Sequence, residues 1–347
     1  METVKFRMSA EWTIVLLTLG HFCVDGISGA VVSGTDLLLF YLLYHLLAFS
    51  IQPLWGILVD DVCHERQFIL ISGLMMVLSA LLPGPMALRI ILAGIGNSLY
   101  HASAGSVAMR DSGSIGPYGI FVAGGATGVA SGYLWPLVMT PVFVTGMILV
   151  SALAFCYAIR ELPEEENPET SPEDSRLLLP AALLMFAICV RAGSPHLSSM
   201  PWKDTTVEAL LLSACIALGK GSGGFFVKRF GMAKVTLFSG VAGGLLLTFG
   251  GSSMVLSLLG TLCINLMMPI TLWLLGKLFP KSPGFAFGLA ASSIILGYLT
   301  GTVIAPLLGD GRKVFLLAGC LLSVLCVLLV ERRSGEKAGY LQAGRNI

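Results

Sequence analysis

Two ionisable residues, His21 and Asp25, stand four positions apart inside an apolar run near the start of the chain. Residues at this spacing share one face of a helix, and Ser28 and Gly29 continue the same polar and small stripe. A carboxylate in apolar surroundings is protonated, paired or in contact with water, because burial disfavours its charge. We therefore predict that Asp25 binds and releases a proton, with His21 as its modulator. The alternative is a fixed structural pair between helices.

Two cations lie in later apolar runs. Arg191 occurs in F-A-I-C-V-R-A-G-S, at about the same depth in its run as Asp25 in the first run. We hypothesise that Asp25 and Arg191 form a charge pair across a central cavity. Because arginine does not lose its proton, the carboxylate would switch and Arg191 would anchor an anion. Lys220, in A-L-G-K-G-S-G-G, either extends its stem to the nearer surface or adds positive charge that favours an anionic substrate.

Further polar candidates lie in two other apolar runs. His101 shares a helical face with Asn97, and His45 lies in the middle of its run. Each histidine is either a site residue or a hydrogen-bonded packing residue. We include His101, Asn97 and His45 as candidates for a substrate or proton pathway.

The composition shows which elements must position these residues. Of the 347 residues, 55% are hydrophobic and only 12% are charged, and the mean hydropathy is +0.86. A soluble chain carries about 25% charged residues, so we predict an all-α protein that crosses a lipid bilayer many times. At about 20 residues per span, a dozen spans use roughly 240 residues, which excludes an extramembrane catalytic domain. The net charge of +1 gives no reason to expect a nucleic-acid partner.

Apolar runs separated by charged, Pro or Gly clusters predict twelve membrane spans in two groups of six. The first group is 11–33, 37–59, 68–85, 86–108, 115–137 and 141–159, and the second is 177–197, 206–227, 232–250, 254–275, 283–308 and 313–330. The predicted domains are a six-helix bundle at 1–160, a linker at 161–176, and a second bundle with a short tail at 177–347. The linker is acidic and rich in proline, so we expect a mobile cytoplasmic tether, with a regulatory segment as the alternative.

The distribution of Lys and Arg predicts the orientation. With the N-terminus inside, fifteen of the 21 Lys and Arg residues lie on the cytoplasmic side and four lie outside. Positive residues favour the cytoplasmic side, so we expect both termini in the cytoplasm and the protein in the plasma (inner) membrane. The first run is too long for a signal peptide and contains ionisable residues, so we expect an uncleaved span.

Two similar loops follow the second and eighth predicted spans. They read G-I-L-V-D-D-V-C-H-E-R (residues 56–66) and G-F-F-V-K-R-F-G-M-A-K (residues 224–234). Both resemble the loop signature of the major facilitator superfamily, and the repetition implies an internal repeat of six helices. The resemblance implies that fold, with two bundles related by pseudo-two-fold symmetry, and gating loops whose charges cap helix ends and pair across the inward face. The implied gating residues are Gly56, Asp60, Arg66, Gly224, Lys228 and Arg229.

Shorter stretches resemble one group within that superfamily. H-F-C-V-D-G-I-S-G (residues 21–29), G-I-G-N-S-L-Y-H (residues 94–101), Arg191 and F-P-K-S-P-G-F-A-F-G-L (residues 279–289) look like the fosmidomycin-resistance exporters. The resemblance implies export of a drug or metabolite by proton antiport, and a monomer.

The fifth predicted span carries Gly124, Gly128 and Gly132 at four-residue spacing. Such a stripe lets another helix approach closely, so we predict helix packing there. The same run is similar to the Gly-Pro signature of antiporters.

These observations predict a secondary transporter that alternates access by rocking one bundle against the other. Asp25 would couple protons, and Arg191 would anchor the charge pair or a small organic solute. The sequence holds no nucleophile, phosphate-loop or metal-protease pattern. We therefore expect no enzyme activity and no cofactor, and energy from an ion gradient in place of ATP.

Two other functions are kept as alternatives. A divalent metal-ion transporter would use His21, Asp25 and His101 as ligands. It requires these residues to converge, and it leaves Arg191 unexplained because a nearby cation repels metal. A non-transporting sensor of the same fold would agree with the short chain and with the departures from the loop signature, in which Asp61 and Cys63 replace a basic residue and a glycine and Lys228 replaces the acid.

Overall fold

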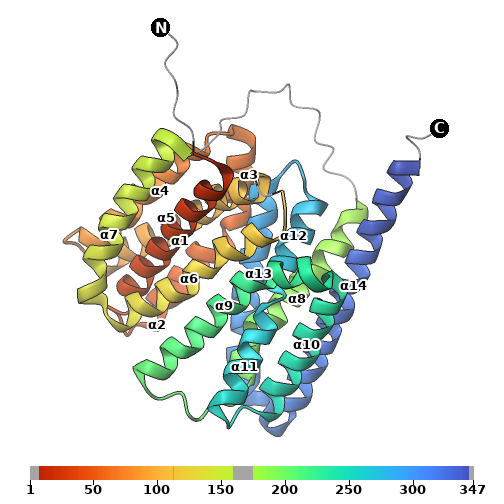
Figure 1. The fold of residues 1–347 in the computed structure, drawn as a ribbon. Helices are drawn as coiled ribbons and strands as arrows, with labels where there is room; N and C mark the ends of the chain where they lie inside the picture. The colour runs from red at the N-terminus through yellow and green to blue at the C-terminus, as the bar shows by residue number, and fades with distance from the viewer. Residues whose placement is uncertain (1–7, 112, 159–174, 344–347) are drawn as a thin grey trace.

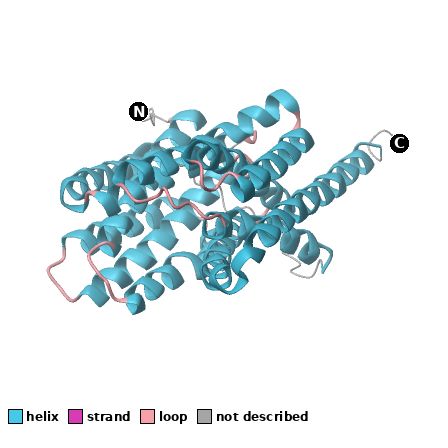
Figure 2. Ribbon diagram, turned by 90° about the horizontal axis from the view of Figure 1, so that it is seen from below, coloured by secondary structure: helices cyan, strands magenta, loops and turns pink. Residues whose placement is uncertain are grey.

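The computed structural model describes residues 8–111, 113–158 and 175–343, and the regular structure of these residues is all helical (Figure 2). The first seven α-helices are α1 (Ala10–Val32), α2 (Leu38–His45), α3 (Gln52–Val62), α4 (Glu65–Leu81), α5 (Met86–Asp111), α6 (Gly116–Leu134) and α7 (Pro136–Leu153). The next seven are α8 (Leu178–Leu197), α9 (Thr206–Phe230), α10 (Met232–Phe249), α11 (Met254–Asn265), α12 (Met268–Leu278), α13 (Pro283–Leu308) and α14 (Arg312–Ala343).

Two pairs of these helices run on as single rods. A π-helical turn over Leu46–Ser50 joins α2 to α3, and Leu266 and Met267 join α11 to α12. The fourteen described α-helices therefore form twelve rods, which coincide with the twelve predicted spans. Helix α14 continues beyond the predicted end of the last span at residue 330, to Ala343. Charged side chains stop an apolar pattern, but they do not interrupt backbone hydrogen bonding.

Eight of the described helical segments are long and apolar enough to cross a membrane, and one of them, Pro283–Arg333, contains α13 and the larger part of α14. Helix α5 is not among the eight. It carries polar side chains, yet Asn97, Ser98 and His101 are all buried. The polar face of α5 is therefore covered by other helices and does not meet lipid, so the helix can carry polar residues at membrane depth.

The helices lie in two groups, with α1–α7 on one side and α8–α14 on the other (Figure 1). The groups meet along two seams: α6 packs against α9, and α13 packs against α3 and α5. Residues 161–174 of the predicted linker lie outside the described residues. The candidate residues that could act together must therefore meet between these two seams.

The glycine stripe of α6 packs against α1, in agreement with the prediction of close helix packing. A Cβ at Gly124 would lie 2.7 Å from the backbone oxygen of Thr18. At Gly128 and Gly132 a Cβ would collide with the backbone oxygens of Phe22 and Gly26. Only glycine fits at such distances. The stripe therefore sets how α1 is oriented against α6, and with it the direction in which His21 and Asp25 point.

Helix α13 uses glycines to approach both groups of helices. Near its start, a Cβ at Gly288 would lie 2.6 Å from the Cα of Pro53 in α3. Farther along, a Cβ at Gly301 would lie 2.9 Å from the backbone oxygen of Gly193 in α8. The same helix therefore packs against its own group and forms part of the seam with the other group.

Candidate functional site

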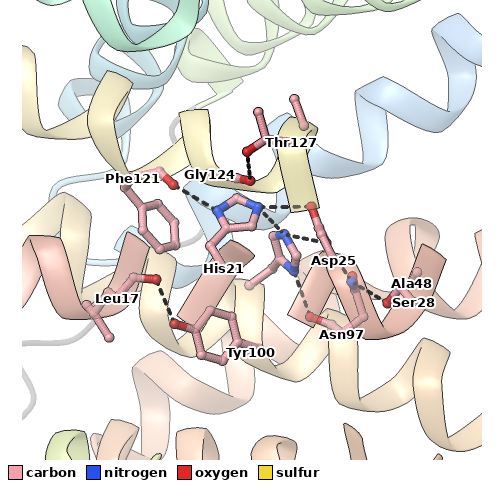
Figure 3. A network of polar contacts seen from close by, with 12 residues as sticks. Leu17, His21, Asp25, Ser28, Ala48, Asn97, Tyr100, Phe121, Gly124 and Thr127 are labelled. Carbon is pink, nitrogen blue, oxygen red and sulfur yellow. Dashed lines mark hydrogen bonds and ion pairs between the residues drawn. The ribbon is translucent and has the colours of Figure 1, made fainter. Parts of the chain in front are cut away.

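Three ionisable side chains meet beside the α6 stripe and form the imidazole cluster, defined as His21, Asp25 and His101 (Figure 3). His21 Nε2 lies 3.3 Å from Asp25 Oδ2, and His101 Nε2 lies 3.7 Å from Asp25 Oδ1. The two Nε2 atoms lie 2.8 Å apart. Helix α1 supplies two members, and α5 supplies the third.

Backbone carbonyls hold both imidazole rings in place. His21 Nδ1 lies 2.9 Å from the oxygen of Phe121 in α6, and His101 Nδ1 lies 2.8 Å from the oxygen of Asn97. Asn97 also donates from Nδ2 to Asp25 Oδ1 at 2.9 Å and to Ser28 Oγ at 3.1 Å. Helix α5 thus contacts all three members of the cluster.

The anchoring of the rings fixes what the cluster can bind. A carbonyl oxygen only accepts, so the Nδ1 atom of each ring must be the donor in its bond. Each neutral ring then presents a bare lone pair at Nε2, and two lone pairs repel at 2.8 Å. A hydrogen bond between the rings needs one additional proton, whose positive charge the Asp25 carboxylate balances. The geometry of the cluster can therefore accommodate one proton between the two imidazoles.

The imidazole cluster opens onto a cavity of about 170 Å³ between the two groups of helices. All three members line it on the side of α1 and α5, and Lys220 of α9 lines it from the other group. The remaining wall is mostly apolar, from Phe49, Val122, Gly125, Ala126, Val129, Met268, Leu272, Phe287, Ala290, Ala291 and Ile294. Small-molecule sites have this composition, in which a few polar groups converge on an apolar pocket.

Lys220 therefore faces the cavity. Its charge interacts favourably with Asp25 and unfavourably with Arg191. The three charges thus share one electrostatic region, although they come from α1, α8 and α9.

Arg191 does not pair with Asp25, so the predicted charge pair is absent from this conformation. Among the described residues, the ion pairs of Asp25 are with imidazoles. Arg191 is 8% exposed and donates from Nη1 to Asn265 Oδ1 at 3.3 Å. Its Nε and Nη2 atoms are buried without a hydrogen-bond partner. Equal depth in two helices therefore does not imply contact. The ion-pair partners of the Asp25 carboxylate, His21 and His101, belong to the same group of helices as Asp25.

His45 lies outside the imidazole cluster, at the α2–α13 contact. Its Nδ1 atom lies 2.8 Å from the backbone oxygen of Tyr41, to which it is hydrogen-bonded. Its ring stacks on the ring of Tyr298, with the ring centroids 5.5 Å apart. The Tyr41 hydroxyl bonds to the Tyr298 hydroxyl at 2.5 Å. His45 thus belongs to an aromatic contact that joins the two groups of helices.

The first predicted gating loop forms a contact between the two groups. Asp60, at the end of α3, accepts hydrogen bonds from the backbone N–H groups of Gly284 and Phe285, both at 2.8 Å. These N–H groups belong to the first turn of α13, where the helix dipole favours a negative charge. A Cβ at Gly56 would collide with the backbone of Gly284. We call this interaction the Asp60 cap.

The other predicted gating residues behave differently from one another. A Cβ at Gly224 would lie 2.6 Å from the Cα of Gly116, so this glycine brings α9 close to α6. Lys228 and Arg229 are exposed at the end of α9. Arg66 donates to the backbone oxygen of Phe155 at 3.5 Å.

Several contacts were not predicted. Glu65, within the first gating loop, is buried and forms an ion pair with Arg110. Asn265 accepts a hydrogen bond from the Arg191 guanidinium. Gly125 borders the imidazole cluster, since a Cβ there would strike both the Asp25 carboxylate and the His21 ring. Of these contacts, only that of Asn265 had a signal in the sequence, namely an asparagine inside an apolar run.

Replacing Asp60 by Asn is expected to weaken the contact between α3 and α13. The amide keeps one acceptor oxygen and loses the charge, and hydrogen bonds to a charged group contribute about 1.5–3 kcal/mol. We expect the ratio of open to closed forms at this end to rise at least about tenfold. Spin labels at Ser114→Cys and Lys281→Cys, in a variant without native cysteines, measure the opening. Asp61→Asn, which alters an exposed carboxylate, should change nothing; an unaltered distance in Asp60→Asn would show that the cap does not hold the seam.

No protein-family model matches the sequence, and no curated protein matches it. Solved structures match the fold over nearly the whole chain. The human organic anion transporter MFSD10 (TETRAN) is 14% identical, with a TM-score of 0.69 over 93% of this chain and 100% of that chain. The E. coli fucose:proton symporter FucP is 14% identical, with a TM-score of 0.60 over 94% and 98% of the two chains. A second FucP structure, in the outward conformation, is 11% identical, with a TM-score of 0.64 over 93% and 99%.

At this level of identity the likeness establishes the fold. The protein is an all-α membrane protein with the major facilitator fold, in which twelve helical rods form two six-helix bundles. The cavity lies between these bundles, and the imidazole cluster lies on its wall.

Proposed function

We propose that the protein is a secondary active transporter that couples the movement of a small organic solute to protons at the imidazole cluster. The observation that carries the proposal is the pair of Nε2 atoms 2.8 Å apart beside a carboxylate, on the wall of the cavity between the bundles. A hydrogen bond between the two Nε2 atoms needs one proton. A solute bound in the cavity would lie next to that proton.

Rocking of the bundle at 1–160 against the bundle at 177–347 would expose the cavity to each side in turn. The Asp60 cap holds one end of the seam, and the Tyr41–Tyr298 hydroxyl pair holds it farther along α13. We propose that these contacts break alternately during the cycle. The distribution of Lys and Arg supports cytoplasmic termini in the plasma membrane, which puts the Asp60 cap at the cytoplasmic end.

The sequence resemblance to fosmidomycin-resistance exporters supports proton antiport by a monomer as the working mode. In this mode the proton and the solute occupy the cavity at different stages and cross in opposite directions. The run that carries Gly124, Gly128 and Gly132 resembles the Gly-Pro signature of antiporters, and its glycines pack against α1.

A divalent metal ion is the second candidate cargo, because one atom from each cluster member lies within 4.8 Å of the others. Histidines that bind metals commonly donate from the second ring nitrogen to a backbone carbonyl, as both rings do here. Two observations disfavour it. Nitrogens around a tetrahedral zinc ion lie roughly 3.3 Å apart, which is wider than 2.8 Å. Lys220 also adds a positive charge to the same cavity.

Transport into proteoliposomes with an entrapped pH-sensitive dye tests the proposal. The candidate solutes are benzoate, methylphosphonate, tetraphenylphosphonium, Zn²⁺ and Mn²⁺, chosen first by thermal stabilisation of the purified protein. A ligand at 100 times its Kd stabilises by about 2.7 kcal/mol, which a melting curve resolves. We expect an organic solute to drive proton movement, with opposite directions of proton and solute for antiport. Activity with metals alone would support the metal transporter, and binding without flux would support a sensor.

A further inference from the structure

The guanidinium of Arg191 has one edge without a partner. Nη1 donates to Asn265, but Nε and Nη2 make no hydrogen bond. These two nitrogens point the same way from the planar group and form the fork that binds two oxygens of a carboxylate or phosphonate side by side. The side chain is only 8% exposed, so bulk water does not solvate this edge.

An arrangement of this kind is costly for a protein without a ligand. Arginine stays charged in proteins, so the group cannot relieve its burial by losing a proton. A buried charge is normally paired or fully hydrogen-bonded. Asn265 offers a neutral amide oxygen, and its own Nδ2 donates to the backbone oxygen of Thr261 at 2.8 Å. These two hydrogen bonds fix the Asn265 amide, which in turn orients the guanidinium. A neutral amide does not balance the positive charge of Arg191.

Lys220 is the second cation that the C-terminal bundle brings to this region. Lys220 lies on the cavity wall, and its charge interacts with that of Arg191. Helix α9 also packs closely against α11 here, because a Cβ at Gly219, the neighbour of Lys220, would lie 2.8 Å from the Asn265 Cβ. The C-terminal bundle therefore contributes two cations to this region, whereas the N-terminal bundle contributes the imidazole cluster.

We propose that the free edge of Arg191 binds the oxyanion of the transported solute, a small organic carboxylate or phosphonate, with Asn265 as a positioning residue and Lys220 as the second cation. This inference rests on the proposed transport function and specifies its substrate class. Arg191 does not line the 170 Å³ cavity in this conformation. The oxyanion therefore reaches the fork when the bundles separate, and Lys220 meets it first from the cavity.

Thermal stabilisation of the purified protein by sodium benzoate and sodium methylphosphonate tests the inference. Benzamide serves as the neutral counterpart of benzoate, and sodium chloride controls for ionic strength. We expect at least one oxyanion to stabilise the wild type and benzamide to have no effect. Arg191→Lys keeps the charge and loses the fork, so the apparent affinity should fall at least tenfold. Arg333→Lys, at an exposed position of α14, should bind as the wild type does.

A second variant tests the inference independently if Arg191→Lys folds poorly. Asn265→Asp places a carboxylate beside the guanidinium, which should raise the melting temperature and abolish stabilisation by added oxyanions. Equal stabilisation of wild type, Arg191→Lys and Asn265→Asp would overturn the inference, as would an absence of oxyanion binding to wild type. If a cationic or neutral solute then drives proton movement in proteoliposomes, the transport function stands and only the oxyanion site is wrong.

Discussion

Asp25→Asn should abolish solute-driven proton movement in proteoliposomes while leaving the protein folded. The amide has nearly the same size and can still accept from an imidazole and from Asn97, which bonds the native carboxylate. It cannot balance the additional proton between the rings. Removing one partner of a buried ion pair costs about 3–5 kcal/mol, so proton occupancy at a given pH should fall more than about a hundredfold.

The dye signal from the solute that is active with wild type measures this loss. Asp36→Asn is the matched control, since it makes the same chemical change at an exposed carboxylate. Its proton movement should equal that of wild type. A coupled proton signal that survives in Asp25→Asn would show that the carboxylate is only a structural partner of His21, the alternative that its spacing left open.

Gly132→Leu should prevent stable packing of α6 against α1. A Cβ at this position would collide with the backbone oxygen of Gly26, and backbone cannot move aside as a side chain can. Overpacking commonly costs about 1–3 kcal/mol, and we expect the upper end or more here because the whole helix pair must separate. The unfolding temperature and the monodisperse fraction in detergent report the effect.

Gly113→Leu is the control for this substitution, because nothing lies within 4 Å of a Cβ at that loop position. Its unfolding temperature should stay close to that of wild type. If Gly132→Leu melts at the same temperature as the control, the glycine stripe does not determine the spacing of the two helices.

The positions of the helices were predictable because the signals that end a membrane helix are local. Pro83 and Pro85 separate two rods that have almost no loop between them, and Thr205 with Glu208 forms a capping box at the start of α9. The end of α14 was not predictable in this way, because nothing in the sequence near residue 330 breaks a helix. An apolar pattern reports the thickness of the membrane, not the length of the helix.

The candidate site was predictable only in part, because spacing along one helix is local and contact between helices is not. The four-residue spacing placed His21 and Asp25 on one face, and they do contact each other. Contact of His101, on α5, with His21 and Asp25 was required only by the metal-transporter alternative and was not otherwise predicted. The Asp25–Arg191 pair was inferred from equal depth, which gives neither the distance between two helices nor the direction in which each side chain points.

Helix α13 gives the molecule a mechanical property. Tyr298 follows Gly284 by fourteen residues, about 21 Å along a helix, and these two positions hold the hydroxyl pair and the Asp60 cap. A stiff rod held at two points behaves as a lever: a tilt of roughly 15° about its middle moves each point by about 2.7 Å, in opposite directions. Such a tilt separates one contact while pressing the other together. In the proposed transport cycle, the stiffness of one helix would thus keep the two ends of the seam from opening together.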